Sequence, residues 1–288
     1  MNRDDFTQLT AAFRPRLHRY CARMVGSAFD GEDVVQDTLA RAMEALPVAG
    51  NIENPEGWLL RIAHNAALDL LRQRKRRGTA DNEEALANVA DQASETDARV
   101  AATANLGTFM HLPTLQRSSV LLSDVLGYSL AEIAELLDIS LAAVKAALHR
   151  GRAKLRDLVE SLDEVMPRLP EADRVRLRAY ADRFNARDFD ALRDLLSEEV
   201  RLDLVNRLRL KGRKDVSVYF TRYSENSNWR VMPGWADGRA VLIVSDPTVA
   251  ANDIAYIIAL DWIDEKIAAI RDFRYAPYVM DGLAVERF

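Results

Sequence analysis

The feature that most constrains this chain is a run of three helical patterns between residues 112 and 158. Apolar residues recur there every three or four positions, which predicts a first helix over about 114–126. Ser129 stands just before the second pattern and Glu132 follows three residues later, which is the spacing of a capping box. The second helix is therefore predicted to be short, over 130–137.

A third helix is predicted to begin at Leu141, with Ser140 in position to cap it. Two helices joined by so short a turn form a helix-turn-helix, whose second helix enters the major groove of DNA. From residue 141 to residue 157 five basic residues stand against one acidic residue, although the whole chain has a formal charge of −5. A solvated face on a helical bundle would also be basic. The capped short helix in front of it favours DNA binding.

The length and composition limit the alternatives. A chain of 288 residues exceeds one ordinary core, so we expect two or three domains. The acidic balance argues against a general nucleic-acid coat, so DNA binding must use local basic patches. Cys21 is the one cysteine, which excludes a disulfide framework or a cysteine-rich zinc site, and we expect no cofactor and no metal. No signal peptide or membrane span is evident, so we expect a cytoplasmic protein.

The first domain is predicted to span residues 1–78. A long amphipathic helix runs over about 6–24 and ends at Gly26, and a second helix is predicted to open at Asp30 or Gly31. Acids near a helix start complement its positive end, which explains one or two of them. Four acids exceed what capping requires and indicate a basic protein partner. They are Asp30, Glu32, Asp33 and Asp37.

A loop over residues 47–55, bracketed by prolines, leads into a third helix that begins near Glu56. Trp58 lies on the predicted inner face of this helix. One or two cations would answer the helix dipole at its C-terminal end, but this helix carries more, so phosphate binding is the better account. The basic residues are Arg61, Arg72, Arg74, Lys75, Arg76 and Arg77.

The remaining chain divides by composition. Residues 79–107 carry a strong acidic excess and are predicted to form a flexible linker, followed by the helix-turn-helix domain over 108–162. From 168 to 288 two helices precede a run of alternating apolar residues, which predicts an α+β cone with one further helix. The fold class is thus multidomain, with two all-α domains followed by an α+β domain.

The order of these motifs resembles that of a bacterial RNA polymerase sigma factor of the extracytoplasmic-function (ECF) group. The resemblance rests on DGEDVVQDT, then WLLRIAHNAALDLLRQRKR, then VKAALHRGRAKLR. It implies that core RNA polymerase and promoter DNA are the partners. The polymerase-binding residues would be Asp30, Glu32, Asp33, Gln36 and Asp37. The 47–55 loop would capture a flipped base of the promoter −10 element, since a base must be unstacked before it is read alone. The −10 residues would be Asn51, Asn54, Trp58, Arg61, Asn65, Asp69, Arg72, Arg74, Lys75 and Arg76.

The resemblance also implies that the helix-turn-helix reads the −35 element. This chain has Asp138 where relatives usually have glycine, and aspartate tolerates left-handed backbone at modest cost. Leu141, Ala142 and Ala143 cannot hydrogen-bond bases, although they can touch thymine methyl groups. The candidate −35 residues are Ser140, Ala142, Ala143, Lys145, Ala146, His149, Arg150 and Arg152.

The C-terminal block resembles the SnoaL-like branch of the NTF2-like superfamily, through YADRFNARDFDALRDLLSEEVRLDLV and IAAIRDFRYAPYV. Such folds enclose a pocket, and the candidate lining residues are Tyr180, Asp203, Trp235, Tyr256 and Arg271. All four histidines lie outside this block, so a histidine-based site is excluded. We expect a regulatory domain, with a small-molecule ligand as a possible partner, rather than a catalyst.

Two other functions fit parts of the pattern. A free-standing helix-turn-helix regulator with a sensing domain would explain residues 108–288, but it does not need the acidic 30–37 segment or the basic 58–77 helix. An enzyme with a DNA-binding appendage would require turnover by the C-terminal domain alone. The sequence favours a sigma factor whose C-terminal domain regulates it in cis, with no enzymatic activity of its own.

Overall fold

The computed structural model describes residues 3–77, 99–101, 104–161, 170–225, 229–245 and 254–288. The chain forms two compact units. The first comprises residues 1–163 with Asp281–Leu283, and the second comprises residues 164–280 with 284–288. Among the described residues no helix is both long enough and apolar enough to cross a membrane.

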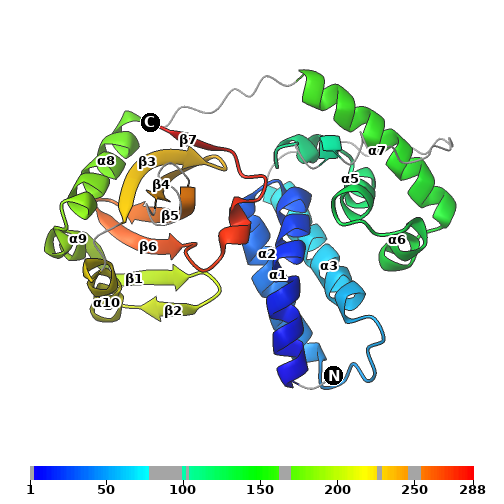
Figure 1. Ribbon diagram of the computed structural model, residues 1–288, viewed down its shortest axis with the longest axis horizontal. Coiled ribbons are helices and arrows are strands. Elements are labelled where there is room, and N and C mark those ends of the chain that lie inside the picture. Colours follow the sequence, from blue (N-terminus) through cyan, green and yellow to red (C-terminus); the bar gives the residue numbers. More distant parts are fainter. Residues whose placement is uncertain (1–2, 78–98, 102–103, 162–169, 226–228, 246–253) are drawn as a thin grey trace. The chain divides into compact units, whose positions relative to one another are not determined.

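Three helices build the first part of the first unit: α1 (Arg3–Val25), α2 (Ala28–Ala45) and α3 (Pro55–Arg77). They lie side by side in Figure 1, in blue to cyan. Gly26 ends α1 with a φ of 72°, a conformation that glycine adopts without a steric penalty. The predicted start of α2 was wrong by two to three residues, because the side chain of Ser27 accepts a hydrogen bond from the Asp30 amide at 3.1 Å and caps the helix earlier.

The helix-turn-helix confirms the local predictions. The 3-10 turn η1 (Thr108–His111) is followed by α5 (Thr114–Val120), the π-helical turn η2 (Leu121–Val125), α6 (Leu130–Leu137) and α7 (Leu141–Ser161). The Ser129–Glu132 capping box is present at the start of α6. Asp138 adopts φ 55° in the turn, and the Ser140 hydroxyl accepts from the Ala143 amide at 3.1 Å. The local sequence patterns therefore predicted the cap, the turn and the start of the third helix correctly.

These two helical regions share one core instead of forming separate domains. The buried cluster of the first unit includes Tyr20 and Leu59 as well as Leu122 and Val144. Ala101, Ala104 and Leu106 are also buried, so the prediction of a flexible linker over 79–107 was wrong for its last residues. Most of that predicted linker lies outside the described residues.

The second unit has the predicted α+β order. The helices α8 (Glu171–Asn185), α9 (Phe189–Asp194) and α10 (Arg213–Ser224) accompany a curved seven-stranded sheet in the order β2-β1-β6-β5-β4-β3-β7 (Figure 1). The strands are β1 (Leu196–Leu204), β2 (Leu208–Lys211), β3 (Arg230–Ala236), β4 (Arg239–Ser245), β5 (Ile254–Ile263), β6 (Lys266–Asp272) and β7 (Val285–Arg287).

Sheet register decides which side chains share a face in this unit. Asp272 pairs with Leu204 on β1 and with Ile258 on β5, so it lies on the same side as these apolar residues. Asp203 and Arg271 are register partners one position earlier, on the opposite side. A short 3-10 turn, η3 (Pro277–Met280), follows β6.

Candidate polymerase and promoter interfaces

The acidic segment of α2 divides into inward and outward groups. Glu32 is fully buried and forms an ion pair with Arg14 of α1. Asp30 is paired with Arg74 near the end of α3. Asp33 and Asp37 are exposed on the same helix, and Gln36 is half-buried.

The inward acids of α2 have structural roles. A buried carboxylate is retained when a cation pairs with it, and here Glu32 joins α2 to α1. We therefore correct the prediction that Glu32 contacts a partner protein, because its side chain has no exposed surface. The side chains of this segment that remain at the surface are those of Asp33, Gln36 and Asp37.

The α3 helix carries the predicted −10 residues along its exposed side. Arg61, Asn65, Asp69, Arg72, Lys75 and Arg76 are exposed, and so are Asn51 and Asn54 in the loop before it. Asp69 accepts hydrogen bonds from Arg41 and Arg72, both at 3.2 Å, which fixes one carboxylate among cations. Arg74 is the exception, because it pairs with Asp30 and donates to the carbonyl of Val25 at 2.9 Å. The predicted DNA contact of Arg74 would require its guanidinium to leave Asp30 and the Val25 carbonyl.

The inner side of α3 holds a half-buried histidine. The hydroxyl of Tyr20 and Nδ1 of His64 lie 2.7 Å apart. Burial first, and then the nearby charge of Arg72, lower the pKa of His64 to about 4. A neutral imidazole is therefore part of the packing between α1 and α3.

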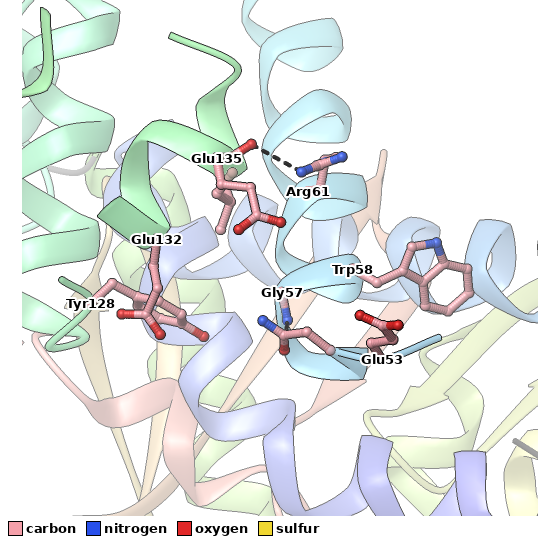
Figure 2. A pocket seen from close by; sticks show the side chains of 9 residues that line it. Glu53, Gly57, Trp58, Arg61, Tyr128, Glu132 and Glu135 are labelled. Atoms are coloured by element: carbon pink, nitrogen blue, oxygen red, sulfur yellow. Dashed lines mark hydrogen bonds between the residues drawn. The ribbon is translucent and has the colours of Figure 1, made fainter. Parts of the chain in front are cut away.

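A cavity of about 220 Å³ lies between the predicted −10 surface and α6, the shorter helix of the helix-turn-helix. Asn54, Trp58 and Arg61 line it from one side, while Glu132 and Glu135 of α6 line it from the other (Figure 2). Arg61 donates a hydrogen bond to the main-chain carbonyl of Glu135 at 2.9 Å, the dashed line in Figure 2. In this conformation the Arg61 guanidinium is hydrogen-bonded to α6, so promoter DNA could contact it only by displacing that hydrogen bond.

The helix α7, which is the predicted recognition helix, exposes only some of its predicted −35 residues. Ser140, Ala142 and Lys145 are exposed, and Ala143, His149 and Arg150 are half-buried. Ala146 is 4% exposed and Arg152 is 5% exposed, so neither can reach DNA as it stands. Nε of Arg152 lies 2.9 Å from Oδ2 of Asp124, and its Nη2 lies 2.5 Å from Oδ1.

We therefore correct the prediction that Ala146 and Arg152 contact the −35 element. Arg152 points into the contact between α7 and the π-helical turn, where it also donates to the Ser123 hydroxyl at 3.2 Å. A bidentate arginine–carboxylate pair of this kind positions two helices.

The five predicted pocket residues of the second unit are not brought together. Asp203 and Arg271 form an ion pair at 3.7 Å on one side of the sheet, and Arg209 lies 3.4 Å from the same carboxyl group. Tyr180 and Tyr256 are buried elsewhere, and Trp235 is half-buried. Asp272, at the end of β6, is a charged side chain with no exposed surface, and the sequence pattern did not single it out. No cluster of metal-ligating side chains occurs among the described residues.

A helical bundle with a basic outer helix, joined in one chain to a capped helix-turn-helix, defines a DNA-binding transcription protein. The comparisons specify the class further. Residues 9–77 match sigma-70 region 2, and residues 108–155 match sigma-70 region 4.

Three relatives that match this chain are RNA polymerase sigma factors. The ECF RNA polymerase sigma factor SigG of Mycobacterium tuberculosis is 33% identical over 224 residues, covering 68% of this chain and 60% of SigG. SigM of the same species is 32% identical over 158 residues, covering 55% of this chain and 79% of SigM. RNA polymerase sigma factor CarQ of Myxococcus xanthus is 32% identical over 163 residues, covering 56% of this chain and 92% of CarQ. The chain belongs to the ECF RNA polymerase sigma factor family.

The chain spans 60% of the length of SigG, so the relationship does not extend to the whole of that protein. Among solved structures, CnrH in complex with the cytosolic domain of CnrY is 25% identical with a TM-score of 0.41, covering 56% of this chain and 92% of CnrH. A putative ketosteroid isomerase from Kribbella flavida is 25% identical with a TM-score of 0.27, covering 35% of this chain and 76% of that protein. TM-scores this low add nothing to the sequence relationships.

Proposed function

We propose that this chain acts as a sigma subunit: it binds core RNA polymerase, recognises promoter −10 and −35 elements and starts transcription. Family membership supports this assignment. The observation that carries it is the presence of two separate surfaces in one chain. The outward acids of α2 offer a contact for a basic protein partner, while the exposed cations of α3 and α7 offer contacts for phosphates. A DNA-binding regulator that works alone needs only the second surface.

We propose polymerase contact through Asp33, Gln36 and Asp37, which share one exposed stretch of α2. The −10 element would meet the 47–55 loop and the exposed side of α3. The −35 element would meet the start of α7, where Leu141 is 45% exposed and Lys145 is exposed beside small alanines. Short apolar side chains at this position favour van der Waals contact with thymine methyl groups.

The second unit is proposed to regulate the sigma module in cis, without catalysis, and to respond to a small-molecule ligand. In the sequence only eight residues separate Ser161, the end of α7, from Pro170, which precedes α8. A connector this short gives an effective concentration on the order of millimolar, so even a weak contact between the two units would be well populated. Regulation therefore needs no separate partner protein.

Run-off transcription with core polymerase tests both parts of the proposal. The full chain should direct transcripts from promoter DNA, and a chain that ends at Asp163 should still bind core polymerase while giving a different transcript yield. Core polymerase alone is the control. Absence of specific transcripts with either chain would refute the sigma assignment. Equal yields from the two chains at matched concentration, across several end points, would refute regulation in cis and leave the sigma assignment intact.

A further inference from the structure

Two arginines of the helices α1 and α3 bond to main-chain carbonyls of the helix-turn-helix region. Arg61 of α3 donates to the carbonyl of Glu135, in the last turn of α6, at 2.9 Å. Arg16 of α1 donates to the carbonyl of Leu126, which follows η2, at 3.0 Å. The Arg16 guanidinium also lies 5.6 Å from the centre of the Tyr128 ring. Carbonyls at the end of a helix have no partner within it and carry partial negative charge, so a cation there is stabilising.

A third arginine makes the same kind of contact in the opposite direction. Arg117 of α5 is 5% exposed and donates to the carbonyl of Met24, in the last turn of α1, at 2.6 Å. Its other terminal nitrogen donates to the carbonyl of Leu112 at 2.9 Å. Burial lowers the pKa of Arg117 to about 10, so the guanidinium still carries its charge at neutral pH. The three arginines and the shared apolar core hold the helix-turn-helix against α1 and α3.

This arrangement places α6 over part of the predicted −10 surface. The guanidinium of Arg61, a predicted −10 residue, is bonded to α6. Glu132 and Glu135 of α6 line the cavity opposite Trp58 and Arg61 (Figure 2). Two carboxylates at this position repel the phosphates that the cations of α3 attract. The helix α6 thus occupies one cation of the −10 surface and adds negative charge beside it.

The three contacts differ in how easily they break. Arg61 is exposed and the Arg16 side chain is 41% exposed, so water can replace either carbonyl at little cost. Arg117 is buried, and taking a buried guanidinium away from its acceptors costs much more. The helix α6 can therefore move away from α3 while Arg117 keeps its contact with α1.

We propose that α6 inhibits DNA binding by the −10 surface of the same chain, and that Arg16 holds α6 in this closed position. A DNA strand that takes the Arg61 guanidinium from the Glu135 carbonyl would displace α6 from α3. Arg61 would then serve two acceptors in turn, the helix end before DNA is bound and a phosphate afterwards. The inference rests on the proposed −10 role of α3 and adds a control that lies within residues 1–163.

The test measures binding of a fluorescein-labelled single-stranded oligonucleotide of mixed sequence to the full chain by anisotropy, without polymerase. Arg16→Ala should bind the strand roughly three- to tenfold more tightly than the unmodified chain, the range of one hydrogen bond. The direction is decisive, because loss of a cation by itself weakens DNA binding. Arg178→Ala on α8 removes an exposed arginine elsewhere and should give no gain. Lys75→Ala should weaken binding, which places the strand on α3.

A second variant tests the negative charge on α6. Glu132→Gln with Glu135→Gln should also tighten strand binding, and the gain should shrink as salt is added. Glutamine can replace glutamate in a capping box, so α6 should stay folded. Asp157→Asn with Glu160→Gln on α7 makes the same change in net charge at exposed positions and should give a smaller gain. Equal gains from the two double variants would show a general charge effect and overturn the role of α6.

Energy transfer between two dyes reports the movement of α6 directly. The dyes are attached at Glu44→Cys on α2 and Ala131→Cys on α6, both exposed positions, while Cys21 is buried. Transfer should fall when the strand binds, and it should already be lower in Arg16→Ala without DNA. Unchanged or weaker strand binding by Arg16→Ala, or unchanged transfer when the strand binds, would overturn the proposal. No strand binding by any variant, with transfer still lower in Arg16→Ala, would contradict the −10 assignment itself and the inhibition with it.

Discussion

The two basic helices α3 and α7 look alike in sequence and differ in the structure. On α3 the cations at Arg72, Lys75 and Arg76 are exposed. On α7 the guanidinium of Arg152 is buried against Asp124. The difference arises because α7 packs against the preceding helix and π-helical turn with one side of its basic segment. A count of charges along a helix therefore overstates how many of them can meet phosphates.

The largest expected effect is on stability at Arg152. Arg152→Ala leaves Asp124 as a buried carboxylate without its cation, and removal of one partner of such a pair costs roughly 3–5 kcal/mol. Replacing both partners, as in Arg152→Met with Asp124→Leu, should recover much of the loss. Urea unfolding at pH 7 measures both variants.

Arg150→Ala provides the comparison on the same helix. It should weaken −35 binding across sequences with a much smaller change in stability. If Arg152→Ala were as stable as Arg150→Ala and instead reduced the salt dependence of DNA binding, the distinction between the two arginines would be wrong.

The second prediction concerns pH and the inner side of α3. The pKa of His64 is lowered to about 4 in the folded chain, against an ordinary value of 6.5. The unfolded chain therefore binds the proton more readily, so this contribution to stability is fully present above about pH 6.5 and is lost as the pH falls toward 4. From pH 7 to pH 5 the loss should be about 2 kcal/mol at most.

His64→Gln should flatten that part of the stability profile, since a glutamine does not titrate. His111→Gln, at an exposed histidine, is the control and should leave the profile unchanged. Urea unfolding at several pH values gives both profiles. An unchanged slope in His64→Gln would mean that this imidazole is not held neutral.

The smallest change in stability is expected at the exposed end of α3. Lys75→Ala and Arg76→Ala should each alter the free energy of unfolding by no more than about 0.5 kcal/mol. Each should lower the log–log salt slope of promoter binding by about 0.7 to 0.9, depending on whether the phosphate belongs to a single strand or a duplex. Lys214→Ala on α10 removes the same charge elsewhere and should leave the slope unaffected.

Sequence reasoning succeeded where the signal was local. Ser129 and Glu132 stand three residues apart and Asp138 directly follows α6, so the local pattern alone predicted this helix, its cap and its turn. The burial of Glu32 and Arg152 depends on Arg14 and Asp124, which lie 18 and 28 residues away. No periodicity within one helix shows which of its charges will find a partner on another.

The same limit explains why Asp272 and its two tyrosine partners in the second unit were missed. Tyr219 and Tyr223 stand four residues apart, a spacing that places two hydroxyls on one side of a helix. Their shared acceptor, Asp272, is 49 residues beyond Tyr223, and only the sheet register brings it to that side. The strands β2 and β7 have only four and three residues, too few for an alternating pattern to be recognised in the sequence.

Binding to core RNA polymerase is the most direct test of the central claim that the outward acids of α2 make this chain a sigma subunit. Asp33→Lys with Asp37→Lys should weaken core binding at least tenfold in a fluorescence anisotropy titration, while the circular dichroism spectrum and unfolding midpoint stay close to those of the unmodified chain. Asp4→Lys with Asp5→Lys on α1 makes the same change in net charge at exposed positions and should bind as the unmodified chain does. Equal core binding by both double variants, or no core binding by the unmodified chain, would contradict the account.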